Sequence, residues 1–108
     1  MQTRSTRIIV FIAAAMLATG TARAQDVKVG KAIAQVWCSN CHLVDPQEQR
    51  TARDGVPTFL AIARMKSTTE ISLAAFLKAP HGGMPDATLS RKEIQDVSAY
   101  IVSLGQLP

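Results

Sequence analysis

The chain is poor in the residues that build disulfide frameworks and common metal sites. It has only 2 Cys and 2 His among 108 residues, whereas a small disulfide-stapled domain needs several cysteine pairs. A structural zinc site needs a second Cys pair or a His pair at finger spacing, and the sequence offers neither. Runs of alternating β-branched and aromatic residues long enough for a core strand are also missing. These absences exclude a zinc finger and a disulfide scaffold, and they favour a helical domain.

What the sequence does contain is one short motif that uses both cysteines and one of the two histidines. Cys38-Ser39-Asn40-Cys41-His42 has the pattern C-x-x-C-H. The two-residue spacer places the cysteines about one helical turn apart, so both thiols can reach the two vinyl groups of one haem. His42 follows directly and supplies the imidazole for the iron. We predict one haem c, attached through Cys38 and Cys41.

Two other interpretations of the cysteine pair are weaker. A redox dithiol of the thioredoxin type needs a preceding strand within a βαβ unit, and the flanking segments have a helical pattern instead. A disulfide between Cys38 and Cys41 would close too small a loop to stabilise the chain much.

The first 24 residues have the features of a signal peptide. Arg4 and Arg7 precede an apolar run, 8–18, that is shorter than the roughly 20 residues of a membrane-spanning helix. Residues 22–24 read Ala-Arg-Ala, a small-x-small cleavage site. We therefore expect export to the periplasm, with 25–108 as a single domain that has no stable membrane insertion after cleavage. An uncleaved membrane anchor is the alternative.

Removal of residues 1–24 changes the charge balance. Three of the twelve basic residues are lost with this segment and none of the eight acidic ones, so the net charge falls from +4 to about +1. A charge this small does not favour nucleic acid or a membrane surface as partner. A domain of this size is barely stable on its own core, and a covalently bound apolar macrocycle would complete that core.

Apolar periodicity and capping boxes predict four helices after residue 24. They span 27–38, 58–64, a segment that opens at the capping box 67–70 and stops before Pro80, and a segment that opens at the capping box 90–93 and ends at Gly105. Segment 43–57 is expected to be a loop. The inward-facing residues are expected to be Val27, Ile33, Ala34, Trp37, Phe59, Leu60, Ile62, Ile71, Leu73, Ala74, Phe76, Leu77, Ile94, Val97, Ile101, Val102 and Leu104.

The sixth iron ligand decides what the haem can do. A methionine thioether raises the potential and blocks small ligands, which favours electron transfer. Met84 lies in a Gly-Gly-Met-Pro loop where the backbone can approach the haem face, whereas Met65 falls at the end of a short helix. We predict His42 and Met84 as the metal ligands. His81 is the alternative sixth ligand.

With these features the chain resembles the small class I, mono-haem, bacterial cytochromes c. The matching features are Gly30 ahead of the motif, the motif itself, Pro57, Met84-Pro85 and Tyr100. The resemblance implies an all-α fold wrapped around the haem, with the N- and C-terminal helices crossing where Gly30 meets Tyr100. It also implies that the carbonyl of Pro57, or of a neighbour, accepts a hydrogen bond from the Nδ1–H of His42, the proximal iron ligand of the family.

One departure from the family concerns the first helix, where Ala34 occupies a position that is often aromatic. Trp37 is a candidate to cover the ring edge instead. The partners of the haem propionates stay open; Arg50, Arg53, Lys66 and Trp37 are candidates from polarity and position only.

The expected function is electron transport rather than enzymatic catalysis. The resemblance implies a soluble monomer that carries single electrons from a dehydrogenase or membrane oxidoreductase to a terminal oxidase or reductase. Its small charge implies docking through a weak, partly apolar patch. Two alternatives are a dedicated subunit of a periplasmic dehydrogenase, and a haem protein with an open sixth position that binds gases or acts as a peroxidase. Lysines and arginines that could rim the docking face are Lys28, Lys31, Arg91 and Lys92.

Overall fold

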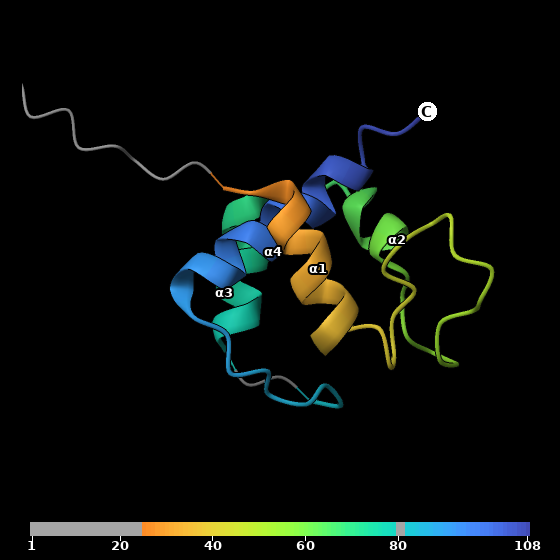
Figure 1. The fold of residues 1–108 in the computed structure, drawn as a ribbon, viewed down its shortest axis with the longest axis horizontal. Coiled ribbons are helices and arrows are strands. Elements are labelled where there is room, and N and C mark those ends of the chain that lie inside the picture. Colours follow the sequence, from red (N-terminus) through yellow and green to blue (C-terminus); the bar gives the residue numbers. More distant parts are fainter. Residues whose placement is uncertain (1–24, 80–81) are drawn as a thin grey trace, which may run out of the picture.

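The structure, a computed structural model, describes residues 25–79 and 82–108, and this part contains four helices and no strand (Figure 1). The helices are α1 (Val27–Trp37), α2 (Phe59–Ala63), α3 (Glu70–Lys78) and α4 (Arg91–Leu104). Helix α4 packs against each of the other three and is the centre of the domain. The expectation of an all-α fold is confirmed. The predicted signal peptide and His81 lie outside the described residues.

Helices α1 and α4 cross at Gly30. A Cβ atom at this position would lie 2.0 Å from the carbonyl oxygen of Asp96 and 3.0 Å from the Cβ of Tyr100. Only glycine permits so close an approach of the two backbones. The close packing of Gly30 near Tyr100 implied by the resemblance is therefore present, and the nearest group is the α4 backbone rather than the tyrosine ring.

A buried carboxylate fastens the start of α1 to α4. Asp96, 2% exposed, accepts a hydrogen bond from the backbone N–H of Asp26 at 2.8 Å and forms an ion pair with Lys92. Burial raises the pKa of Asp96, but these two hydrogen bonds and the Lys92 charge outweigh it and leave the pKa below its usual value. The ionised carboxylate thus joins the N-cap of α1 to α4.

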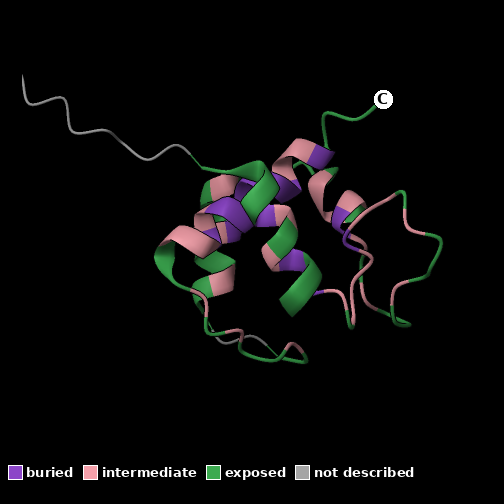
Figure 2. Cartoon of the chain, in the orientation of Figure 1, coloured by how far each residue is buried: buried purple, intermediate pink, exposed green. Residues whose placement is uncertain are grey.

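The core lies between α4 and the segments that cover it (Figure 2). It includes Ala34 of α1, Val44 of the following loop and Phe59 of α2. Tyr100 of α4 packs near Phe59, with ring centroids 6.4 Å apart, and its hydroxyl donates to the carbonyl oxygen of Val44 at 2.7 Å. Both sides of this buried hydrogen bond are therefore satisfied.

The expected capping box at 67–70 is wrong by two residues. The N-cap of α3 is Thr69, whose Oγ1 accepts from the backbone N–H of Ser72 while the Ser72 Oγ accepts from the Thr69 N–H. With Ser67 as the cap, Thr68 would be the first residue of the helix. It belongs instead to the turn after α2, because its N–H donates to the Met65 carbonyl and its hydroxyl donates to the Ile62 carbonyl. Those bonds close the turn after α2. The capping box at 90–93 is confirmed, with Ser90 as N-cap.

Several residues expected to face inward are exposed. Val27 is 41%, Trp37 55%, Ile71 84% and Phe76 52% exposed. Val27 and Trp37 stand at the two ends of α1, beyond its crossing with α4, and α3 buries only Leu73 because it packs on α4 alone. A helical period identifies an apolar stripe but not how much of it a neighbour covers.

Candidate haem site

The five-residue motif forms a tight turn at the C-terminal end of α1. The N–H of Cys38 donates to the carbonyl of Ala34 at 2.8 Å, and the N–H groups of Cys41 and His42 both donate to the carbonyl of Cys38, at 3.2 and 2.9 Å. The two cysteines thus stand about one helical turn apart, as the spacing predicts. Both are free thiols, with Cys38 buried and Cys41 half-buried.

The ring of His42 is fixed by a carbonyl from a distant part of the chain. Its Nδ1 lies 2.6 Å from the carbonyl oxygen of Pro57. A carbonyl can only accept, so Nδ1 carries the proton and the lone pair of the neutral ring is on Nε2. The Phe59 ring supports the imidazole at a centroid distance of 5.3 Å and a tilt of 53°. The hydrogen bond to Pro57 that the resemblance implied is present, and it leaves the lone pair of Nε2 available to bind a metal.

The loop that returns to Pro57 is attached to the motif through residues 50–53. Arg50 donates to the carbonyl of Ser39 at 2.6 Å and to that of His42 at 3.3 Å, and its Nε pairs with Glu48 at 2.5 Å. The N–H of Arg53 donates to the carbonyl of Cys41 at 2.8 Å. Sequence reasoning treated Arg50 only as a candidate propionate partner, because no spacing rule connects an arginine to carbonyls eight and eleven residues away.

Lys31, one of the basic residues expected at the rim of the docking face, is already paired within the domain. It forms a salt bridge with Asp45 at 2.5 Å. The hydrogen bond from Lys31, with a further one from the Gln47 N–H, lowers the pKa of Asp45 below its usual value despite some burial. This pair connects α1 to the loop behind the motif.

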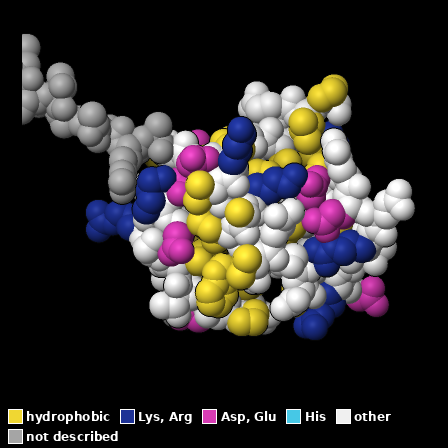
Figure 3. Space-filling view, in the orientation of Figure 1, with side chains coloured by type: hydrophobic (Ala, Val, Ile, Leu, Met, Phe, Trp, Pro, Cys, Tyr) yellow, Lys and Arg dark blue, Asp and Glu magenta, His cyan; other side chains and the backbone are white. Residues whose placement is uncertain are grey.

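Met84 arrives on a different segment, the loop between α3 and α4. It is half-buried and lines a small pocket together with Leu77, Ala79, Pro85, Asp86, Ala87 and Leu89. Gly83 precedes it with φ of +82°, a conformation that favours glycine and turns the chain ahead of the methionine. Figure 3 shows hydrophobic side chains gathered over the end of α1 and this loop. Met65, by contrast, is 52% exposed.

These residues fit a covalently bound haem. The turn offers two free thiols and an imidazole with its lone pair on Nε2, and the loop with Met84 offers a thioether beside an apolar pocket lining. Burial raises the pKa of the Cys38 thiol to about 11, so before attachment it is a neutral thiol at neutral pH. Across residues 25–79 and 82–108, no group of three or more His, Cys, Asp or Glu side chains could hold a metal ion by itself.

Within the described residues, no helix has the length and apolar character needed to cross a membrane.

Comparison with known proteins supports the same assignment. No family model matches the chain, and no solved structure does. The chain is 39% identical over 98 residues to cytochrome c-552 of Bradyrhizobium diazoefficiens. The aligned stretch covers 91% of this chain and 93% of that protein. An identity of this level over nearly the whole of both chains, together with the helical fold, shows that the chain belongs to the small class I cytochromes c, electron-transport proteins that carry a covalently attached haem.

Proposed function

We propose that the chain is a periplasmic mono-haem carrier of single electrons, in which His42 and Met84 would ligate the iron and Cys38 and Cys41 would attach the haem. Its donor would be a dehydrogenase or membrane oxidoreductase, and its acceptor a terminal oxidase or reductase. No bond is made or broken in a substrate, so the protein acts as a carrier and not as an enzyme. The mature chain would be the single domain 25–108.

One observation carries the proposal: the hydrogen bond between His42 Nδ1 and the Pro57 carbonyl. It fixes both the tautomer and the plane of the ring, and so presents Nε2 as a basic ligand in a set orientation. The bound haem supplies the one-electron chemistry. The chain's own residues hold the two thiols at the attachment spacing, orient the imidazole and offer a thioether that blocks small ligands.

The first experiment is the optical spectrum of the holoprotein, oxidised and then reduced with and without CO. We expect a weak charge-transfer band at the red edge of the oxidised spectrum and no shift when CO meets the reduced form. Met84→Ala should abolish the band and admit CO, whereas Met65→Ala, which removes the exposed methionine, should leave both unchanged. A wild-type protein that binds CO readily would contradict the carrier and support a gas-binding or peroxidase protein.

Localisation and processing need a separate measurement. The proposal expects the protein in the periplasmic fraction, with Gln25 as its first residue and the mass of one covalent haem added. A chain that retains residues 1–24 in the membrane fraction would instead indicate an uncleaved anchor. Co-purification with one dehydrogenase would indicate a dedicated subunit rather than a free carrier.

A further inference from the structure

We propose that Arg50 is a positioning residue for the haem motif, acting through the backbone carbonyls of Ser39 and His42 rather than on a haem propionate. The inference rests on the proposed ligand role of His42. It names a residue that would set the geometry and potential of the iron site without contacting the haem.

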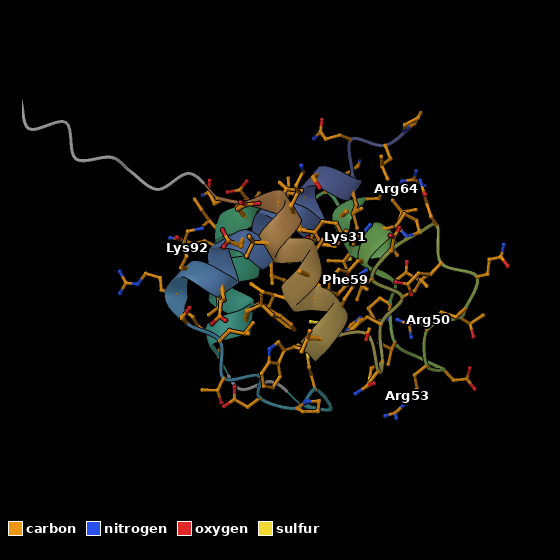
Figure 4. All side chains as sticks on the ribbon, in the orientation of Figure 1. Lys31, Arg50, Arg53, Phe59, Arg64 and Lys92 are labelled. Atoms are coloured by element: carbon orange, nitrogen blue, oxygen red, sulfur yellow. The ribbon has the colours of Figure 1, made fainter. Side chains whose placement is uncertain are left out.

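The guanidinium of Arg50 is already committed to protein groups. Of its five N–H donors, one each is directed to Glu48, Ser39 and His42, at 2.5, 2.6 and 3.3 Å. The rigid fork of the guanidinium lets one side chain bond two carbonyls at once, which the single ammonium of lysine does less well. Figure 4 shows Arg50 turned inward from its loop.

The two carbonyls that Arg50 bonds belong to residues whose positions decide the geometry of the motif. Ser39 stands between the cysteines, and His42 carries the ring that Pro57 orients. The carbonyl between them, that of Cys41, accepts from the backbone of Arg53. Three carbonyls of the motif are therefore held by one short segment, 50–53, and Arg50 itself bonds those of Ser39, between the two cysteines, and of His42.

A fixed positive charge beside the motif also has an electrostatic effect. Reduction removes one positive charge from the iron site, so a nearby cation favours the reduced state. Arg50 should therefore raise the reduction potential, by its charge and by holding His42 in place.

Arg53 offers a matched control in the same loop. Its side chain is exposed, points away from the fold in Figure 4, and makes no hydrogen bond or ion pair to any described residue. Arg53→Gln removes the same unit charge three residues away and keeps the N–H that bonds Cys41. Arg50→Gln removes the charge, the ion pair with Glu48 and the two bonds to carbonyls, whereas Arg50→Lys keeps the charge alone.

The test measures amide hydrogen exchange at Cys41, His42 and Arg53 in the reduced holoprotein, the resonance of the His42 Nδ1–H, and the reduction potential. Arg50→Gln should speed exchange at these amides by about tenfold or more, since hydrogen bonds to charged groups are lost. It should also shift the Nδ1–H resonance and lower the potential further than Arg53→Gln does. Arg53→Gln should stay within about twofold of wild-type exchange.

Arg50→Lys separates charge from geometry. It should lower the potential less than Arg50→Gln does, while exchange at the motif still accelerates, and it carries the test if Arg50→Gln does not accumulate with haem. Equal exchange in the Arg50 variants and Arg53→Gln would overturn the proposal, as would proton contacts between the guanidinium and the propionate methylenes in place of Ser39. A wild-type spectrum without His/Met ligation would instead refute the proposed function, and it is read before any variant is made.

Discussion

At the scale of single residues, sequence reasoning could predict the arrangement of residues that are close together in the chain. Cys38, Cys41 and His42 are adjacent in the chain, so their spacing alone places them on one turn. Arg50 could not be found in this way, because its bonds depend on the path of a loop. Arg50 and Gly30 both lie against a backbone carbonyl, of Ser39 and of Asp96 respectively. Contacts with backbone groups of this kind cannot be predicted from a motif of side chains.

Gly30→Ala should destabilise the protein by about 1–3 kcal/mol, although alanine is the better helix former, because the added methyl group would overlap the Asp96 carbonyl. Chemical denaturation of the holoprotein measures this directly. Gly82→Ala is the matched control, since a Cβ there meets nothing within 4 Å. Equal stability of the two variants would mean that α1 and α4 do not cross as closely as described.

At the scale of helices, the number, order and approximate bounds of the four elements could be predicted, whereas the start of α3 could not. The expected cap, Ser67, and the observed cap, Thr69, stand two residues apart, and both are residue types that cap helices, so local sequence does not choose between them. The choice is made by the turn after α2, in which Thr68 is bonded to Ile62 and Met65. These bonds join the segment before α3 to the end of α2, and the apolar periodicity of a single helix does not predict them.

Thr69→Ala should cost about 1 kcal/mol of unfolding free energy, because the first turn of α3 loses the hydroxyl that accepts from Ser72. Ser67→Ala should change the unfolding free energy by less than about 0.5 kcal/mol, since Ser67 contributes only its backbone carbonyl, to Ser72. The reverse order of the two effects in thermal or urea unfolding would restore Ser67 as the cap.

The tie between α1 and α4 should depend on pH. The pKa of Asp96 is lowered in the folded state, so its ionised carboxylate stabilises the fold above the unfolded pKa, near 4, and this stabilisation is lost as the pH falls through the folded pKa. Asp96→Asn should lower stability by about 1–3 kcal/mol at pH 6. The gap between the two proteins should narrow below about pH 4.

Urea unfolding at several pH values tests this, with the exposed Asp54→Asn as control. A gap between wild type and Asp96→Asn that stays constant down to pH 2 would contradict a role for the charge.

At the scale of the whole molecule, the core is small and centred on one helix. Four of its nine buried members lie on α4, two lie in the segment that follows α1 (Cys38 and Val44), and α1, α2 and α3 contribute one each. Several large apolar side chains remain exposed, among them Val36, Trp37 and Phe76. Burial on this scale leaves a domain of fewer than about 90 residues only marginally stable, so the attached haem should contribute much of the stability.

Replacing both cysteines, Cys38→Ala with Cys41→Ala, should therefore give a mature chain with reduced helicity and no cooperative unfolding transition. Circular dichroism during thermal unfolding measures both, with the wild-type holoprotein beside it. A double variant that unfolds cooperatively at the wild-type midpoint would show that the polypeptide alone supplies the stability.

The crossing of the first and last helices also sets the order in which the chain can close. The bond between Asp26 and Asp96 joins residues 70 positions apart, so α1 meets its partner helix only through a long-range contact. Closing so long a loop carries a high entropic cost and tends to come late. The cysteine-bearing turn therefore stays accessible on an open polypeptide until α4 docks on α1, which gives haem attachment a time window that ends with that step.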